Sequence, residues 1–380
     1  MKSRNAYLDV VRGLLILFAC SEHFTQFLND WYIETFKKSD IIDLNAVPVL
    51  VQQYFYHLKF LGHILSADPI SSVIALMFVP WVTHMFIGFA GYNIVRKKPT
   101  AIKQNLAQIN KGLLFMFFLF YAENFVVTRE FFGGLLMLPV VAWMLILIFS
   151  NYIYGFFGLS GVLLTFILSL ALKVISNLGY FQINYFSHLI SSIHPRVVES
   201  TEPLNYLPAC LAGMLIGIIL NQKERSSPIF KKLAFLFGAS TLFFLWNSRQ
   251  LFKHDPLHVF SYDELLTTNN FGVLFIISII GVSLTLLHQL DKKNPPKWLL
   301  PLQYVGANSL GIFLIHRILF IDILAPIRFH LGSYFKLPMT NNIFEVMLIY
   351  FPCTVLCYWL LTKFGFFGPL FAKNSKASPE

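Results

Sequence analysis

The sequence predicts an all-α, polytopic integral membrane protein, and three observations lead to this prediction. Hydrophobic residues make up 56% of the 380 residues and charged residues only 13%, and the mean hydropathy is +0.63. A soluble domain carries about 25% charged residues. Apolar runs close to the ~20 residues that cross a hydrocarbon core recur along the chain, and Lys and Arg gather between them.

About ten transmembrane helices are expected, within a single domain that covers residues 1–380. No repeat period and no low-complexity linker divides the chain. The spans are predicted at 7–28, 70–95, 112–128, 131–150, 153–175, 204–221, 230–248, 270–290, 301–325 and 343–366.

The basic residues between the spans predict the orientation. If the N-terminus is cytoplasmic, the inner segments, which include 96–111, 222–229, 291–300 and a short turn at 151–152, carry 17 of the 29 Lys and Arg with their flanks. The outer segments carry 9, and 3 lie within spans. This bias predicts a cytoplasmic N-terminus and a cytoplasmic C-terminus. The net charge of +10 is scattered in the same way, so no nucleic-acid partner is expected.

The first span carries four ionisable side chains, Asp9, Arg12, Glu22 and His23. Each costs roughly 2.5–3.5 kcal/mol at the centre of a bilayer, so the group calls for a reason. Arg12 and His23 are eleven residues apart, which is about three helical turns, so they share one face and lie roughly 16 Å apart along the axis. Two alternatives stay open: Arg12 forms a structural ion pair with Asp9, and Glu22 reaches the outer water.

Polar residues in three later spans complete the candidate site. His84 lies near the middle of span 70–95, Glu123 toward the outer end of span 112–128, and Asn308 and His316 in span 301–325. The predicted topology places His23, His84, Glu123 and His316 from the bilayer centre outward, with Arg12 on the inner side. The histidines have a plainer alternative as hydrogen-bonded packing residues.

Four segments resemble the transmembrane acyltransferase superfamily. YLDVVRGLLILFACSEH resembles its opening, in which Arg12 and His23 match the Arg-x10-His pattern of the acyltransferase-3 family. PWVTHMFIGFAGYNI is similar to the Trp-x-Thr-His start of bacterial relatives of the heparan-alpha-glucosaminide N-acetyltransferase. PLNYLPACLAGMLIGIIL and VGANSLGIFLIH are similar to two later spans of these relatives. The matches occur in order from the first span to the ninth. The chain departs from the pattern at Ser21-Glu22 and at Phe86–Phe89, which leaves the acceptor and the acyl group unassigned.

The resemblance implies acyl transfer from cytoplasmic acyl-CoA, with acetyl-CoA as the expected donor, to a sugar hydroxyl or amine of an extracytoplasmic glycan. It implies a multi-pass protein of the bacterial inner (cytoplasmic) membrane. The catalytic candidates are His23, His316, His84 and Glu123, with His23 as the general base. Arg12, Asp9 and Asn308 are the candidates for binding the donor. No metal is expected.

Two other functions stay open. A proton-coupled secondary transporter or exporter would also place ionisable groups inside spans, with a relay through Asp9, His23, Glu123 and His316. A non-catalytic membrane partner of a glycan-assembly complex is the third. Binding of acetyl-CoA separates the acyltransferase from both.

Overall fold

The regular elements of the computed structural model are all helices in the residues that it describes, 5–20, 69–128, 139–177, 203–222, 228–248, 270–290, 294–324, 327 and 346–364. The all-α prediction is confirmed for these residues. Residues 6–20 form the N-terminal helix. The later helices are α4 (Pro69–Ile94), α5 (Pro99–Gln104), α6 (Leu106–Thr128), α7 (Pro139–Asn177), α9 (Pro203–Gln222), α10 (Ile229–Ser248), α13 (Asn270–Gln289), α14 (Leu300–Ala307), α15 (Ser309–Ile318) and α18 (Phe351–Lys363). A 3₁₀ turn (Lys297–Leu299) precedes α14, and π-helical segments cover Leu319–Leu324 and Val346–Tyr350.

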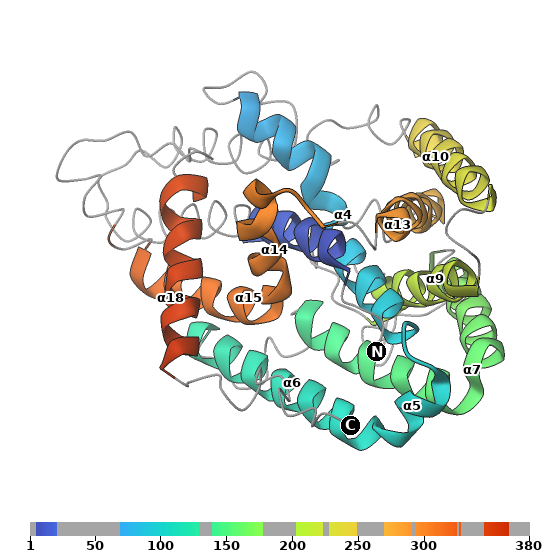
Figure 1. Cartoon of the computed structure of the whole chain (residues 1–380), viewed down its shortest axis with the longest axis horizontal. Coiled ribbons are helices and arrows are strands. Elements are labelled where there is room, and N and C mark those ends of the chain that lie inside the picture. The colour runs from blue at the N-terminus through green and yellow to red at the C-terminus, as the bar shows by residue number, and fades with distance from the viewer. Residues whose placement is uncertain are drawn as a thin grey trace.

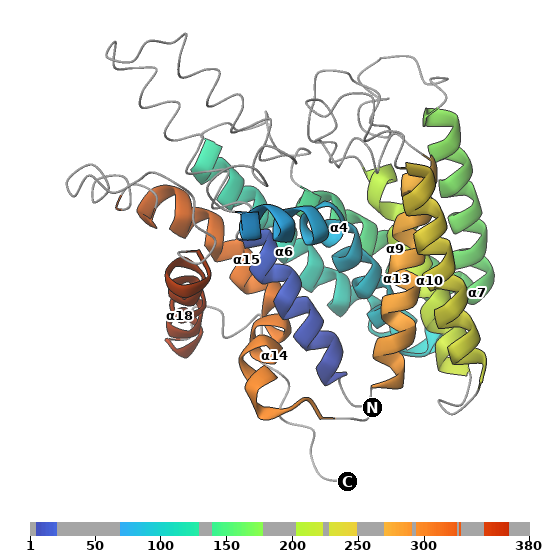
Figure 2. The same cartoon turned by 90° about the horizontal axis from the view of Figure 1, so that it is seen from above.

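Helix α9 is packed against α4, α7 and α13 (Figures 1 and 2). Small residues bring its backbone against α4. A Cβ atom at Gly213 would lie 1.9 Å from the Gly88 carbonyl oxygen, and one at Gly91 would lie 2.2 Å from the Cys210 carbonyl oxygen. Gly88 and Gly91 therefore allow close packing of α4 on α9.

The N-terminal helix crosses α14 at an even closer contact. A Cβ atom at Gly306 would lie 1.7 Å from the Asp9 carbonyl oxygen, and one at Gly13 would lie 2.0 Å from the Leu302 carbonyl oxygen. Only glycine fits at both positions. This crossing brings the first segment of the sequence beside one of the last.

Hydrogen bonds connect several helix ends at one end of the bundle. The Asn5 side chain accepts a hydrogen bond from the Leu8 amide and donates one to the Leu287 carbonyl. Asn221 donates to the Val95 carbonyl, and the Tyr154 hydroxyl donates to the Lys97 carbonyl. Figure 2 shows the N-terminus, α5 and the start of α14 at this end. The N-terminus, α5 and the start of α14 thus lie together, and we call this the basic end.

Helix α7 corrects one predicted turn. The sequence predicts a reversal at 151–152, but both residues lie within a helical arm. The break is at Gly158, whose φ of 59° and ψ of −141° are a conformation that L side chains rarely adopt. Figures 1 and 2 show two arms that diverge from this elbow. The apolar run continues through the turn, so hydropathy alone misplaced it by six residues.

The predicted span 301–325 is not one straight helix. Lys297–Ala307 and Ser309–His316 meet at 69°, with Asn308 at the break. The backbone there has φ −114° and ψ 17°, outside the helical range. The sequence GANS carries a glycine and two residues whose side chains compete with helical hydrogen bonds. These residues favour a helix break, but the continuous apolar run predicted one span.

Apolar side chains cover much of the outside of the described bundle, whereas several polar ones are buried. One described helix, Trp143–Ile175, is long and apolar enough to cross a membrane, and the bent α14–α15 pair passes the same test if it counts as one span. The second arm of α7 exposes Leu159, Leu163, Leu164, Ile167, Leu168, Leu172 and Ile175. The buried polar residues include Asn5, Asp9, His84, Lys173, Ser309 and His316. A contiguous exposed apolar surface of this kind is unusual for a soluble protein, although the interior is also built mainly of hydrophobic residues.

The glycine crossing leads to a stability prediction. Gly306→Ala should lower the free energy of unfolding by about 1–3 kcal/mol or more, because its Cβ overlaps the Asp9 carbonyl and the helices must separate. Thermal unfolding of the purified, detergent-solubilised protein measures the change. Gly238→Ala in α10 is the matched control, since nothing lies within 4 Å of its added Cβ. Equal stability of the two variants would contradict the crossing.

Candidate functional site

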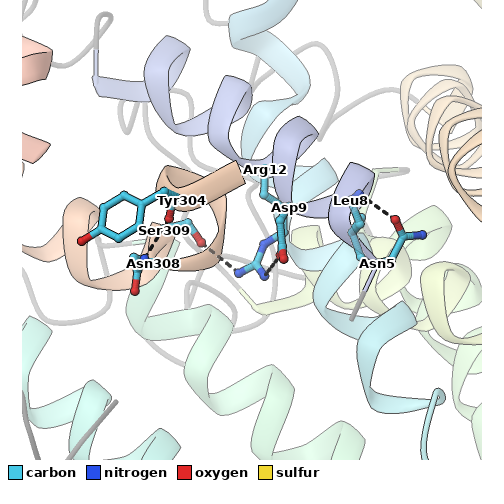
Figure 3. Close-up of polar contacts among 7 residues, drawn as sticks. All are labelled: Asn5, Leu8, Asp9, Arg12, Tyr304, Asn308 and Ser309. Carbon is cyan, nitrogen blue, oxygen red and sulfur yellow. Dashed lines mark hydrogen bonds and ion pairs between the residues drawn. The ribbon is translucent and has the colours of Figure 1, made fainter. Parts of the chain in front are cut away.

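Arg12 links the N-terminal helix to the break between α14 and α15 (Figure 3). One guanidinium nitrogen lies 3.7 Å from an Asp9 carboxylate oxygen, and the other terminal nitrogen donates a hydrogen bond of 2.9 Å to the Ser309 hydroxyl. The Asp9 side chain is 3% exposed and that of Arg12 24% exposed. The ion pair that the i,i+3 spacing offered as an alternative is therefore present. It fixes the guanidinium at the start of α15.

Asn308 is at the bend itself and connects it to a further helix. Its side-chain nitrogen donates to the Tyr304 carbonyl at 2.8 Å, within the last turn of α14. Its side-chain oxygen accepts a hydrogen bond of 3.1 Å from the Tyr358 hydroxyl on α18. The bend is thus held by side chains from both directions, and Tyr358, which is 0% exposed, is a supporting residue that the sequence did not single out.

His316 lies on α15 a little more than two turns beyond Asn308, as its sequence position requires. The residue is fully buried, and its ring lies against Phe313 with ring centroids 4.5 Å apart. Nδ1 contacts the Phe313 carbonyl oxygen. Because a carbonyl only accepts, Nδ1 carries the proton in this contact and Nε2 is the basic nitrogen. The protein therefore selects the tautomer of a histidine that lies about two turns along α15 from the Arg12 contact.

Two predicted catalytic residues have side chains outside the described part of the protein. His23 lies beyond the described N-terminal segment, which ends at residue 20. Glu123 lies within α6, but its side chain is not described. Helix α6 packs on α15 through Phe120 and Phe313, with ring centroids 6.4 Å apart. Glu123 and His316 are each about one turn from this contact along their helices.

His84 belongs to a different group of contacts. Its ring lies against Tyr206 of α9, with ring centroids 4.8 Å apart, and the Thr83 hydroxyl is 3.4 Å from its Nδ1. Trp143 of α7 packs on the same tyrosine at 6.1 Å. Lys173, in the second arm of α7, interacts electrostatically with His84 and is 1% exposed. The sequence could have drawn attention to Lys173, because a lysine inside an apolar run is a reason to suspect a functional site.

The structure therefore divides the predicted residues into two sets. Arg12, Asp9 and Asn308 meet at the α14–α15 bend, and His316 follows on α15. The contacts of His84 are instead with α7 and α9. In the described residues, no group of three or more His, Cys, Asp or Glu is arranged to hold a metal ion. The first set combines a fixed cation, amide and hydroxyl groups and a buried imidazole, which can bind an anionic or carbonyl-containing ligand and move a proton.

Comparison with known proteins gives one match. Residues 217–370 match the model of a family described as a protein of unknown function (DUF418). That segment contains α14, α15 and α18, and so the bend, but neither Arg12 nor His84. No curated protein and no solved structure matches the chain.

The Arg12–Asp9 pair predicts a non-additive effect on stability. Arg12→Met should lower the free energy of unfolding by about 3 kcal/mol or more, because it leaves the buried Asp9 carboxylate without its cation. Arg12→Met combined with Asp9→Leu should recover most of that loss.

A double-mutant cycle of thermal unfolding, with Asp9→Leu as the other single variant, measures the coupling. A coupling near zero would show that the pair does not contribute to the fold. Lys231→Met is a suitable control because Lys231 is exposed on α10.

Proposed function

We propose that the protein is a membrane-embedded acyltransferase that moves an acyl group, with acetyl expected, from cytoplasmic acyl-CoA to a sugar hydroxyl or amine of an extracytoplasmic glycan. The observation that carries the proposal is the position of Arg12, which is held by Asp9 and Ser309 at the break from which the His316 helix begins. A phosphate-binding side chain and a proton-transfer side chain are thereby connected through one short helix.

Membrane insertion is supported by the distribution of polar and apolar side chains. Exposed leucines and phenylalanines on α7, α10 and α18 suit contact with lipid, and the buried polar residues need partners inside the bundle. Each arm of α7, on either side of Gly158, has 19 residues, or about 28 Å of helix, which suits one crossing apiece. We retain about ten spans with both termini inside as the proposed topology.

The basic end is the proposed donor side. Acyl-CoA carries several phosphate charges, and the segment 96–111 supplies Lys and Arg there. Lys97 and Lys103 are placed against α7, since Tyr154 binds the Lys97 carbonyl and the Lys103 ammonium lies 4.8 Å from the centre of the Phe156 ring. Arg12 lies seven residues from Asn5, so it is roughly 10 Å along its helix from this end. Its planar fork suits a phosphate oxygen or the thioester region of the donor.

The proposed chemistry needs one base and one set of donors. A histidine takes the proton from the acceptor hydroxyl or amine while the acceptor atom attacks the thioester carbonyl. The tetrahedral intermediate collapses with loss of the CoA thiolate, which takes up the proton from the imidazolium. His23 is the first candidate for the base, and His316 is the second because its Nε2 is the basic nitrogen. Asn308 donates one amide hydrogen to Tyr304, and the other suits the oxyanion. Glu123 is proposed to orient a histidine, and His84 stays a secondary candidate.

The bend also favours a second function. Interrupted helices with polar residues at the break line the binding sites of secondary transporters, and α14–α15 has this form. Solute flux that is coupled to protons and does not need acyl-CoA would support a transporter instead.

Two substitutions should separate donor binding from chemistry. Arg12→Lys keeps a charge beside Asp9 but removes the fork, so KM for acetyl-CoA should rise about tenfold with a smaller change in kcat. His316→Ala should lower kcat by about 100-fold or more. The assay follows a labelled acetyl group from acetyl-CoA into envelope glycan in sealed vesicles.

His288→Ala is the matched control, because His288 is a buried histidine that hydrogen-bonds Tyr92 near the basic end. Full activity of a stably expressed His23→Ala or His316→Ala variant would remove that residue from the catalytic role.

The topology gives a separate prediction. In a background with the four cysteines replaced by alanine, Lys103→Cys should react with an impermeant thiol reagent only from the cytoplasmic side. Ser187→Cys, which lies between the predicted spans 153–175 and 204–221, should react only from the outside. Labelling of both from the same side would overturn the proposed arrangement.

A further inference from the structure

The second group of contacts, around Tyr206, has no role in the proposed chemistry. Three helices contribute to it: His84 from α4, Trp143 and Lys173 from the two arms of α7, and Tyr206 from α9. All four residues are more than nine-tenths buried. Two of them carry a buried ring nitrogen, His84 Nε2 and Trp143 Nε1, that forms no hydrogen bond within the described residues. We call these four residues the Tyr206 cluster.

Two buried ring nitrogens without described hydrogen-bond partners, on the two residues that pack against Tyr206, lower the stability of the protein. A buried donor without an acceptor loses about 1–3 kcal/mol of free energy, and protein interiors satisfy most such groups. The indole nitrogen can only donate. The Thr83 hydroxyl lies 3.4 Å from His84 Nδ1. In the tautomer in which this hydroxyl donates to Nδ1, the proton is on Nε2, which is then a second donor. Lys173 adds positive charge close enough to interact with His84.

We propose that the Tyr206 cluster binds the carboxylate group of a small ligand. A carboxylate offers two acceptor oxygens for the two ring N–H groups, and its negative charge is compensated by Lys173. A metal ion is disfavoured, because the indole nitrogen is no ligand and the lysine repels a cation. Trp143 and Tyr206 also supply the aromatic surface on which the apolar face of a sugar ring packs.

The depth of the cluster agrees with binding of the acyl acceptor rather than of acyl-CoA. Trp143 and Lys173 are each fifteen residues from the elbow at Gly158, or roughly 22 Å of helix from the basic end. In the proposed topology this is the outer half of the bilayer. Resting on the proposed function for this step alone, the inference names the acceptor class as an acidic sugar.

The test measures binding to the purified full-length protein without acyl-CoA, so it is independent of the transfer assay. Glucuronate should raise the unfolding temperature, whereas glucose at the same concentration and sodium chloride at the same ionic strength should not. The apparent affinity for glucuronate should fall about tenfold or more in Trp143→Phe, which keeps the ring but removes the N–H, and in Lys173→Met.

Matched controls are Trp298→Phe and Lys231→Met, since both residues are exposed elsewhere, and they should bind as the wild type does. If Lys173→Met does not fold, Trp143→Phe decides. Stabilisation by acetate but not by glucuronate would support the carboxylate site and assign it to small organic acids. Equal stabilisation by glucose, no effect of any carboxylate, or unchanged affinity in Trp143→Phe would overturn the proposal. Failure of the transfer assay alone would leave it standing.

Discussion

The backbone contact between Gly13 and Gly306 sets the geometry on which the candidate site depends. Because neither residue has a Cβ, the N-terminal helix approaches α14 until backbone meets backbone. At that separation Arg12, one residue before Gly13, reaches Ser309 across the break. A larger residue at either glycine would separate the two helices and remove the guanidinium from the start of α15. The position of Arg12 in the candidate site therefore depends on the close packing of these two helices.

The buried negative charge of Asp9 is compatible with the fold because it is paired with Arg12. Asp9 is almost fully buried, and a carboxylate in such a place is very unfavourable without a cation. Arg12 compensates it and uses its other terminal nitrogen on Ser309. Asn308 and Tyr358 then hold the bend from the α18 side. Pairing thus confines the guanidinium to one position at the start of α15.

The two sets of polar residues lie in the same helical bundle but are built differently. Around the bend, Arg12 hydrogen-bonds Ser309, and Asn308 hydrogen-bonds both Tyr304 and Tyr358. In the Tyr206 cluster, two ring nitrogens lack a described partner and a lysine is buried beside them. A satisfied network rigidifies a site, whereas an incomplete one gives binding energy to whatever supplies the missing acceptor. This contrast is why the proposal of a further ligand rests on the Tyr206 cluster.

The sequence by itself determined the helical class and offered the Arg12–Asp9 pair as one alternative, because each depends on composition or on spacing within one helix. It did not place the elbow at Gly158 or the bend at Asn308, since apolar runs continue through both. Only the tertiary structure decided that Arg12 meets Ser309 and that His84 joins Trp143, Lys173 and Tyr206. Those contacts join helices far apart in the chain, and hydropathy carries no information on which helices become neighbours.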